Sequence, residues 1–267
     1  GIHTFGDIHT QRKIEAKELS LEGREIRTSV PLFVEKFHVS GALKNTSEGQ
    51  LYIGKEAHIR DGNFVNEGRI WGSDQSFLDL YGNNFTNENI TQKKFLAPDQ
   101  SNTPHRYTSG KKRYSFQTQI MGAGRFSIRG VGTFLNKSLI LPEEGKKDVS
   151  LTIEAKELHN TGQGLIASED LTLRGLGNLL NEGEMRGITD LTLDVKGNLE
   201  NRSKIESLGS LRADVLGNLM NRRGATFTGE RLILNVEGLN LNEGRLSARF
   251  ALIKGKLENF GGITIEE

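Results

Sequence analysis

Residues 170–221 read DLTLRGLGNLLNEGEMRGITDLTLDVKGNLENRSKIESLGSLRADVLGNLMN, and one short pattern recurs within this stretch. Each copy starts with Leu-x-Leu or a close variant, continues to Gly-Asn-Leu, and reaches a second asparagine followed by small or polar residues. Over residues 149–267 the copies fall in blocks of about twenty residues. A fixed period near twenty is typical of a solenoid in which each repeat forms one layer.

The second asparagine of each block is the most regular feature of the repeat. Its spacing is 21, 20, 20 and 21 residues, from Asn160 through Asn181, Asn201 and Asn221 to Asn242. An asparagine amide both donates and accepts hydrogen bonds, so side chains one layer apart can form a ladder. Asparagine also tolerates the left-handed backbone of a sharp bend, and a role in the turn alone is the alternative. Both interpretations make these residues structural.

Apolar residues alternate within each block, which is typical of β-strands. Three short strands separated by bends describe an all-β fold, a parallel β-helix of about 20–21 residues per coil, whose equivalent residues stack roughly 4.8 Å apart. The pattern predicts three internal columns. The first holds Leu151, Leu171, Leu191, Leu211 and Leu232; the second holds Leu179, Leu199, Leu219 and Leu239; the third holds Ile166, Met185, Ile205 and Leu246.

The N-terminal part of the chain follows the same rule with more variation. The hexapeptide IEAKEL occurs twice, beginning at Ile14 and at Ile153, which indicates that both ends share one ancestry. Asn45, Asn66 and Asn87 continue the 21-residue spacing. The early coils are also rich in aromatic rings, which we interpret as a stack inside the solenoid, with an exposed sugar-stacking ring as the alternative. These aromatic residues are Phe33, Phe37, Phe64, Trp71, Phe77, Tyr81 and Phe85.

The period breaks between Asn87 and the next anchor, Asn136, which follows 49 residues later. Residues 91–130 hold eight lysines or arginines against a single acid, and two of the four prolines of the chain. This composition predicts a basic loop that leaves the solenoid and returns to it near Phe126. The predicted regions are N-terminal coils over residues 1–90, the insertion with its re-entry over residues 91–133, and regular coils over residues 134–267.

The basic insertion is the strongest candidate for a binding site. Cations interleaved with aromatic rings suit a sulfated or acidic glycan, an anionic lipid or a nucleic acid. We expect an acidic glycan or a cell-surface receptor as the partner and no specific nucleic acid, and a merely soluble loop is the alternative. The candidate residues are His105, Arg106, Tyr107, Lys111, Lys112, Arg113 and Tyr114.

Composition and motifs argue against several other functions. The chain has no cysteine, so it has neither a disulfide framework nor a thiolate nucleophile, and its formal net charge is only +1. No nucleotide-binding, serine-hydrolase or zinc-protease motif is present. The histidines are dispersed without metal-ligand spacing, and Asp170 and Asp190, one coil apart, are interpreted as solvated. We predict no enzyme, metal or cofactor; a carbohydrate-active β-helix enzyme is the alternative.

The beginning of the chain gives two further expectations. Gly1 falls within what reads as a coil, which predicts a fragment of a longer protein. The terminal coils of such a fragment present strand edges, and exposed edges favour end-to-end self-association.

The repeated pattern Leu-x-Leu…Gly-x-Leu-x-Asn-x-Gly-x-Ile/Leu covers residues 42–89 and 134–267. This pattern resembles the haemagglutinin-type repeats of bacterial filamentous haemagglutinin, which also occur in the long stalks of contact-dependent inhibition toxins. The resemblance is specific for a fold and carries little information about function. The basic insertion departs from the plain repeat.

The resemblance implies a right-handed β-helix within a secreted or cell-surface exoprotein of the two-partner secretion family, which acts as an adhesin or presents a toxin in virulence. It also implies an outer-membrane transporter as a partner while the parent protein is secreted. Family members begin with a secretion domain that bears Asn-Pro-Asn motifs, and this chain has no Asn-Pro dipeptide. We therefore expect a non-enzymatic stalk segment that presents the basic loop to a host or target cell; an inert stalk beside a polymorphic toxin is the alternative.

Overall fold

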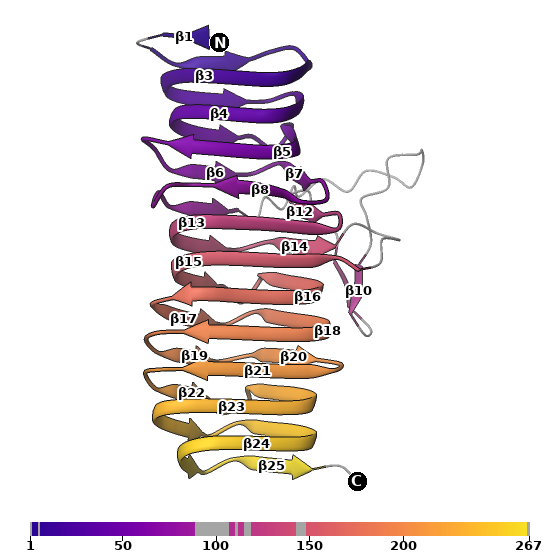
Figure 1. Ribbon diagram of the computed structural model, residues 1–267, viewed down its shortest axis with the longest axis vertical. Helices are drawn as coiled ribbons and strands as arrows, with labels where there is room; N and C mark the ends of the chain where they lie inside the picture. The colour runs from indigo at the N-terminus through magenta and orange to yellow at the C-terminus, as the bar shows by residue number, and fades with distance from the viewer. Residues whose placement is uncertain are drawn as a thin grey trace.

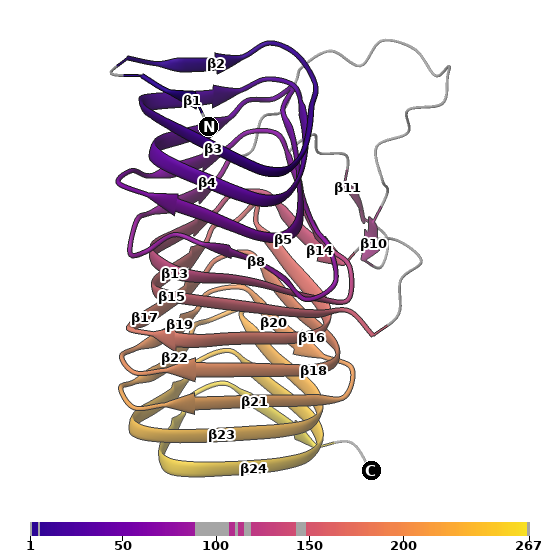
Figure 2. The same ribbon diagram turned by 45° about the horizontal axis from the view of Figure 1, so that its top comes forward.

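The computed structural model describes residues 2–4, 6–88, 107–109, 112–114, 119–142 and 148–265. These residues form strands and no helix, and the main sheet winds into a parallel β-solenoid of about 11 turns (Figure 1). The coils stack along one axis, with the N-terminal coil at one end of the rod and the C-terminal coil at the other (Figure 2). The predicted β-helix is confirmed.

The strands of the N-terminal coils are β1 (Ile2–His3), β2 (Ile8–Thr10), β3 (Ile14–Thr28), β4 (Pro31–Asn45), β5 (Gln50–Arg60), β6 (Phe64–Asn66), β7 (Arg69–Gly72), β8 (Ser76–Asp79) and β9 (Phe85–Asn87). The short strands β10 (Tyr107–Ser109) and β11 (Lys112–Tyr114) form a separate sheet. The later coils contain β12 (Gln119–Gly122), β13 (Arg125–Asn136), β14 (Leu139–Pro142), β15 (Ser150–Asn160), β16 (Leu165–Leu176), β17 (Asn178–Asn181), β18 (Glu184–Val195), β19 (Leu199–Asn201), β20 (Lys204–Ser207), β21 (Ser210–Val215), β22 (Leu219–Asn221), β23 (Thr226–Asn242), β24 (Arg245–Asn259) and β25 (Gly262–Ile265).

Each coil contributes strands to three faces of the solenoid. In one coil the first face holds residues 171–174, the second face residues 179–181 and the third face residues 184–187, and each pairs in parallel with the coils before and after it. Burial alternates along most strands, because successive side chains of a strand point to opposite sides of a sheet. On the third face, β12 and the first four residues of β16 are buried throughout. The inward side chains of all three faces make one continuous apolar core.

Two of the predicted columns of apolar residues are confirmed. The leucines of the first column pair in register, from Leu151 to Leu232, and each is at most 4% exposed. The third column also forms, and Phe227 occupies the position between Ile205 and Leu246.

The second column differs from the prediction at its C-terminal end. Leu219 pairs with Asn240, not with Leu239, so the buried position of that coil holds an asparagine. The reason lies in the register of the strand: the residue two before each ladder asparagine points inward, and Asn240 stands two before Asn242. Both polar side-chain atoms of Asn240 are buried without a hydrogen-bond partner.

The buried asparagines of the second face form a continuous ladder. Nδ2 of Asn181 donates to Oδ1 of Asn201 at 2.9 Å, and Nδ2 of Asn201 donates to Oδ1 of Asn221 at 3.0 Å. The same bond links successive members all along the rod, and each of these side chains is fully buried. The predicted members are Asn45, Asn66, Asn87, Asn136, Asn160, Asn181, Asn201, Asn221 and Asn242.

The ladder extends beyond its predicted members at both ends. The hydroxyl of Thr28 donates to Oδ1 of Asn45 at 3.0 Å, and Nδ2 of Asn242 donates to Oδ1 of Asn259 at 2.7 Å. Both added residues lie 17 positions from their neighbour in the ladder. A period of twenty does not predict them, because these coils are shorter. Buried amides satisfied in this way avoid the free-energy cost of an unpaired polar group.

Glycine follows the ladder asparagine because two coils approach closely there. A Cβ atom at Gly183 would lie 2.1 Å from the carbonyl oxygen of Gly164 in the preceding coil. Close stacking at this bend therefore favours the glycine of Asn-x-Gly, and the small residue serine takes the equivalent position at Ser138 and Ser203.

The aromatic residues divide between the inside and the outside of the solenoid. Phe64, Phe85 and Phe134 stack in the core with ring centroids 5.0 Å apart, and Phe37 is also fully buried. The prediction of an internal stack is wrong for the remaining aromatic residues, because they alternate with buried neighbours and so point outward. These outward residues are Phe33, Trp71, Phe77 and Tyr81.

The insertion interrupts a single coil. Asn87 of β9 pairs directly with Asn136 of β13, although 49 residues separate them. The chain is back in the solenoid at β12, which pairs with β7 on one side and with β14 on the other. This return comes earlier than the expected position near Phe126.

Replacing the ladder residue Asn201 by leucine is expected to lower the free energy of unfolding by about 2–4 kcal/mol, because the change leaves buried amide groups of Asn181 and Asn221 without their partner. Urea unfolding followed by circular dichroism measures the effect. An unchanged midpoint would contradict a stabilising role for the ladder.

The same chemical change at Asn240 is expected to act in the opposite direction. Asn240→Leu removes two unpaired buried polar atoms and continues the column of Leu219, so the free energy of unfolding should rise by about 1–3 kcal/mol. Asn201→Leu is the matched control for Asn240→Leu, and urea unfolding measures the midpoint of each variant. A loss of stability in Asn240→Leu would show that the amide has a role.

Candidate functional site

The predicted basic binding loop is described by the structure only in part. β10 and β11 pair in antiparallel fashion, with Tyr107 opposite Tyr114 and Thr108 opposite Arg113. His105, Arg106 and Lys111 lie outside the described residues. The backbone pairing brings two tyrosines and two cations, Lys112 and Arg113, into one hairpin; binding by this loop stays a prediction.

Asp170 and Asp190 face one another in neighbouring coils of the first face. They are register partners at the start of the strands. Burial raises the pKa of the Asp170 carboxyl, and the nearby charge of Asp190 raises it further. Among the described residues, no group of three or more histidines and acids is arranged to hold a metal ion. Glu169 and Asp148 add further negative charge near the Asp170 carboxyl.

Two of the histidines that are dispersed in the sequence, His38 and His58, lie together in the structure. His38 and His58 are register partners on the first face, and their rings stack in parallel with centroids 5.2 Å apart. The hydroxyl of Tyr81 lies 2.8 Å from Nδ1 of His58, and Nη2 of Arg60 donates to the same hydroxyl at 3.0 Å. Their spacing of one coil length, twenty residues, is the sequence signal that reveals the pair.

The hydrogen bonds of this cluster meet at the Tyr81 hydroxyl. Arg60 can only donate, so the hydroxyl accepts from it, and the tautomer of His58 sets the direction of the bond between the hydroxyl and Nδ1 of His58. Nε2 of His58 lies 3.5 Å from a carboxylate oxygen of Glu56. Tyr81 has a backbone φ of 51°, in the left-handed region that favours glycine.

A ladder of aromatic rings runs along the outside of the third face. Phe33 and Tyr52 stack at 4.1 Å with planes 14° apart, and Tyr52 and Trp71 stack at 4.4 Å with planes 2° apart. Each ring comes from the next coil, since Phe33 pairs with Tyr52 and Tyr52 with Trp71. Tyr52 was missed in the sequence because its neighbours are one coil away in either direction.

The faces of these stacked rings are covered. Both faces of Tyr52 meet a neighbouring ring, Nζ of Lys13 lies over Phe33 at 4.8 Å from the centroid, and Met121 takes the column position after Trp71. Stacking of a sugar ring needs a free aromatic face, so Tyr52 is excluded from this contact. The rings present their edges to the surroundings.

A groove of about 400 Å³ runs beside this aromatic ladder. Ring edges line it on one side, and the small residues Ala16, Gly54 and Ala123 help to keep it open. The charged side chain that lines it, Glu35, forms an ion pair with Lys55 at 2.8 Å. The groove is therefore largely apolar, and the charge of Glu35 at its edge is neutralised by Lys55.

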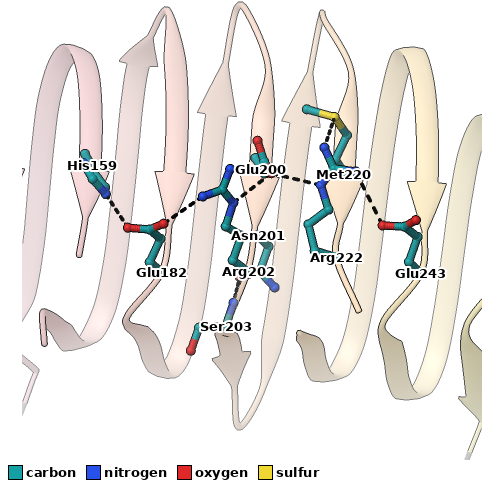
Figure 3. A network of polar contacts seen from close by, with 9 residues as sticks. All are labelled: His159, Glu182, Glu200, Asn201, Arg202, Ser203, Met220, Arg222 and Glu243. Atoms are coloured by element: carbon teal, nitrogen blue, oxygen red, sulfur yellow. Dashed lines mark hydrogen bonds and ion pairs between the residues drawn. The ribbon is translucent and has the colours of Figure 1, made fainter. Parts of the chain in front are cut away.

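A chain of ion pairs crosses the coils of the C-terminal half (Figure 3). Its members come from the second face and the bend that follows it, and one coil supplies both Glu200 and Arg202. The carboxylate of Glu200 accepts hydrogen bonds from both Arg202 and Arg222 at 2.9 Å. In order along the rod the members are His159, Glu182, Arg202, Glu200, Arg222 and Glu243.

Charges of opposite sign in this chain shift the pKa of its carboxylates. Desolvation alone would raise the pKa of Glu200, but the hydrogen bonds from Arg202 and Arg222 outweigh it and hold the pKa below its ordinary value. A hydrogen bond from His159, assisted by Arg202, lowers the pKa of Glu182. Each lowered pKa means that the charged carboxylate stabilises the folded state.

Replacing Glu200 by glutamine is expected to lower stability at pH 7 by up to about 1 kcal/mol, because its ion pairs lie near the surface. The stabilisation is present above the ordinary pKa of 4.5 and is lost as the pH falls through the lowered pKa of the folded state. The difference from the original protein should therefore shrink below pH 4.5. Urea unfolding across pH measures it, with the exposed Glu237→Gln as the control; equal stabilities at pH 7 would contradict the assignment.

Comparisons with known proteins do not assign this chain to a family. No protein-family model, curated protein or solved structure matches the chain. Among the described residues there is also no helix long and apolar enough to cross a membrane. The resemblance to haemagglutinin-type repeats thus rests on the repeat pattern alone and stays a prediction.

Proposed function

We propose that this chain is a non-enzymatic stalk and binding segment of a large bacterial exoprotein that is secreted or displayed at the cell surface. The observation that carries the proposal is the continuous stacking of coils, in which one ladder of buried side chains links Thr28 to Asn259. A solenoid of this kind resists bending, because every inner coil is hydrogen-bonded to two neighbours. Rigidity with periodic construction is what a spacer requires.

The interruption of the rod supports a role in contact. The basic stretch lies in the sequence between β9 and β12, and the coils on either side of it pair directly with each other. A loop carried by a rigid scaffold is the usual place for binding residues in solenoids. The proposed partner is an acidic glycan or a cell-surface receptor, and the parent protein would use an outer-membrane transporter for export.

End-to-end self-association is a second partner proposal. In the last described coils, Phe250, Leu252 and Phe260 are exposed, the last of them by 76%. Exposed apolar side chains favour the docking of another apolar surface.

Neutralising the hairpin tests the contact role without shortening the rod. A variant with Lys111, Lys112 and Arg113 all changed to glutamine should lose most of its binding to cells and to sulfated glycans, and the binding of the original protein should weaken as salt rises. The matched control changes three exposed cations of the rod to glutamine. These control positions are Lys196, Arg223 and Lys254.

The outcomes separate the alternatives. Equal binding by the hairpin variant and the control would remove the hairpin from recognition. No binding by any version would leave an inert stalk. A deletion is less suitable than these substitutions if it extends to Gly124, because it would remove β12 and its pairing with β7 and β14.

A further inference from the structure

We propose that the groove on the outside of the second face, between Thr133 and Met220, binds a neutral β-1,4-linked glycan that lies parallel to the rod. This groove is separate from the hairpin of β10 and β11, so the inference rests neither on the stalk function nor on recognition by that hairpin. It follows from the length of the groove, from the oriented amides of one wall and from the paired charges of the other.

The groove runs along the rod. Its volume is about 430 Å³, and it is lined by residues of β13, β15, β17, β19 and β22, which come from five successive coils. Each coil adds roughly 4.8 Å, whereas a peptide strand advances about 3.3 Å per residue and falls out of step with the coils. An extended β-1,4-linked glycan advances by about one sugar unit per coil, so equivalent hydroxyl groups can meet each coil in turn.

One wall is a row of exposed polar side chains whose orientation is fixed. Oδ1 of Asn178 accepts a hydrogen bond from the backbone N–H of Asn198, and Oδ1 of Asn198 accepts one from the N–H of Asn218, both at 2.9 Å. A backbone N–H can only donate, so these bonds identify the oxygen of each amide. Among the described residues Nδ2 of Asn198 has no partner, and both its hydrogens are available to a ligand.

The same wall offers hydrogen-bond acceptors. Glu157 accepts from Nδ2 of Asn178 at 3.2 Å and has no ion-pair partner in the described part of the chain. Thr133, its register partner in the preceding coil, carries a hydroxyl that can donate and accept. Sugar hydroxyl groups do both, so they suit a wall of mixed donors and acceptors. The carboxylate of Glu157 disfavours an acidic glycan, because like charges repel.

The opposite wall combines apolar side chains with charges that are already paired. In register order its members are His159, Leu180, Glu200 and Met220. His159 and Glu200 belong to the chain of ion pairs in Figure 3, so neither leaves an unpaired charge in the groove. Leu180 and Met220 are half-buried and can pack against the C–H groups of a sugar ring. A ligand with hydroxyl groups on one edge and C–H groups on the other therefore matches both walls.

Isothermal titration calorimetry with cellobiose, cellotetraose and cellohexaose tests the proposal. The affinity should rise from cellobiose to cellotetraose, because the longer chain reaches more coils, and it should level off once the groove is filled. Maltohexaose contains the same sugar in α-1,4 linkage and serves as the matched ligand. It should bind about tenfold more weakly than cellohexaose, because its curved chain leaves some of the hydrogen bonds unmade.

Two variants test the two walls. Asn198→Ala removes the free amide and should weaken cellotetraose binding about fivefold. Its matched control is Asn63→Ala, since Oδ1 of Asn63 likewise accepts a backbone N–H, that of Asn84 at 3.1 Å, in a coil outside the groove. The control should bind normally. Leu180→Ala should also weaken binding about fivefold, through lost apolar contact. Circular dichroism confirms that each variant is folded.

Several results would overturn the proposal. They are an affinity independent of chain length, equal binding of maltohexaose and cellohexaose, equal losses in Asn198→Ala and Asn63→Ala, and the absence of saturable binding. The variant with a neutralised hairpin should bind cellohexaose normally, and a loss there would move the site to the hairpin. If Asn198→Ala fails to fold, the Leu180→Ala comparison still decides.

Discussion

Every feature of this solenoid depends on one constraint: each side chain lies about one strand spacing, roughly 4.8 Å, from its counterpart in the next coil. A residue type is stable in a column only if it tolerates a neighbour of the same kind above and below. Leucines meet this condition by packing and asparagines by donating and accepting in turn. Charged residues meet it by alternation, as Lys36 does between Glu18 and Glu56. Asp170 and Asp190 break the rule: burial raises the pKa of Asp170, and the charge of Asp190 raises it further.

The sequence was sufficient for the fold because the asparagine spacing is nearly constant. Counting from those asparagines gives the inward leucines of the first column and the ladder itself. The error at Leu239 arose from counting twenty residues from Leu219, whereas counting two residues back from Asn242 gives the buried Asn240. Thr28 and Asn259 were not predicted as ladder members for a related reason, since coils of 17 residues fall outside the expected period.

The outer surface was much harder to predict than the core. The His38–His58 pair and the aromatic ladder are invisible to motifs that expect partners a few residues apart, because their members are separated by a whole coil. Outward aromatic residues also alternate with inward ones, so composition alone assigned Phe33 and Trp71 to the core. The basic cluster was found by composition, and the backbone pairing of β10 and β11 adds only that Tyr107 and Tyr114 lie opposite each other.

The asparagine ladder also gives the rod a direction. Every amide in it donates toward the C-terminal neighbour, from Asn45 to Asn66 through to Asn242 and Asn259, so the side-chain dipoles add along the axis. One end of the row offers hydrogen-bond acceptors and the other offers donors. A side chain that extends the row beyond Thr28 must therefore donate to it, and one that extends it beyond Asn259 must accept from it. The polarity of a single side-chain column thus restricts which residues can lengthen the ladder at each end.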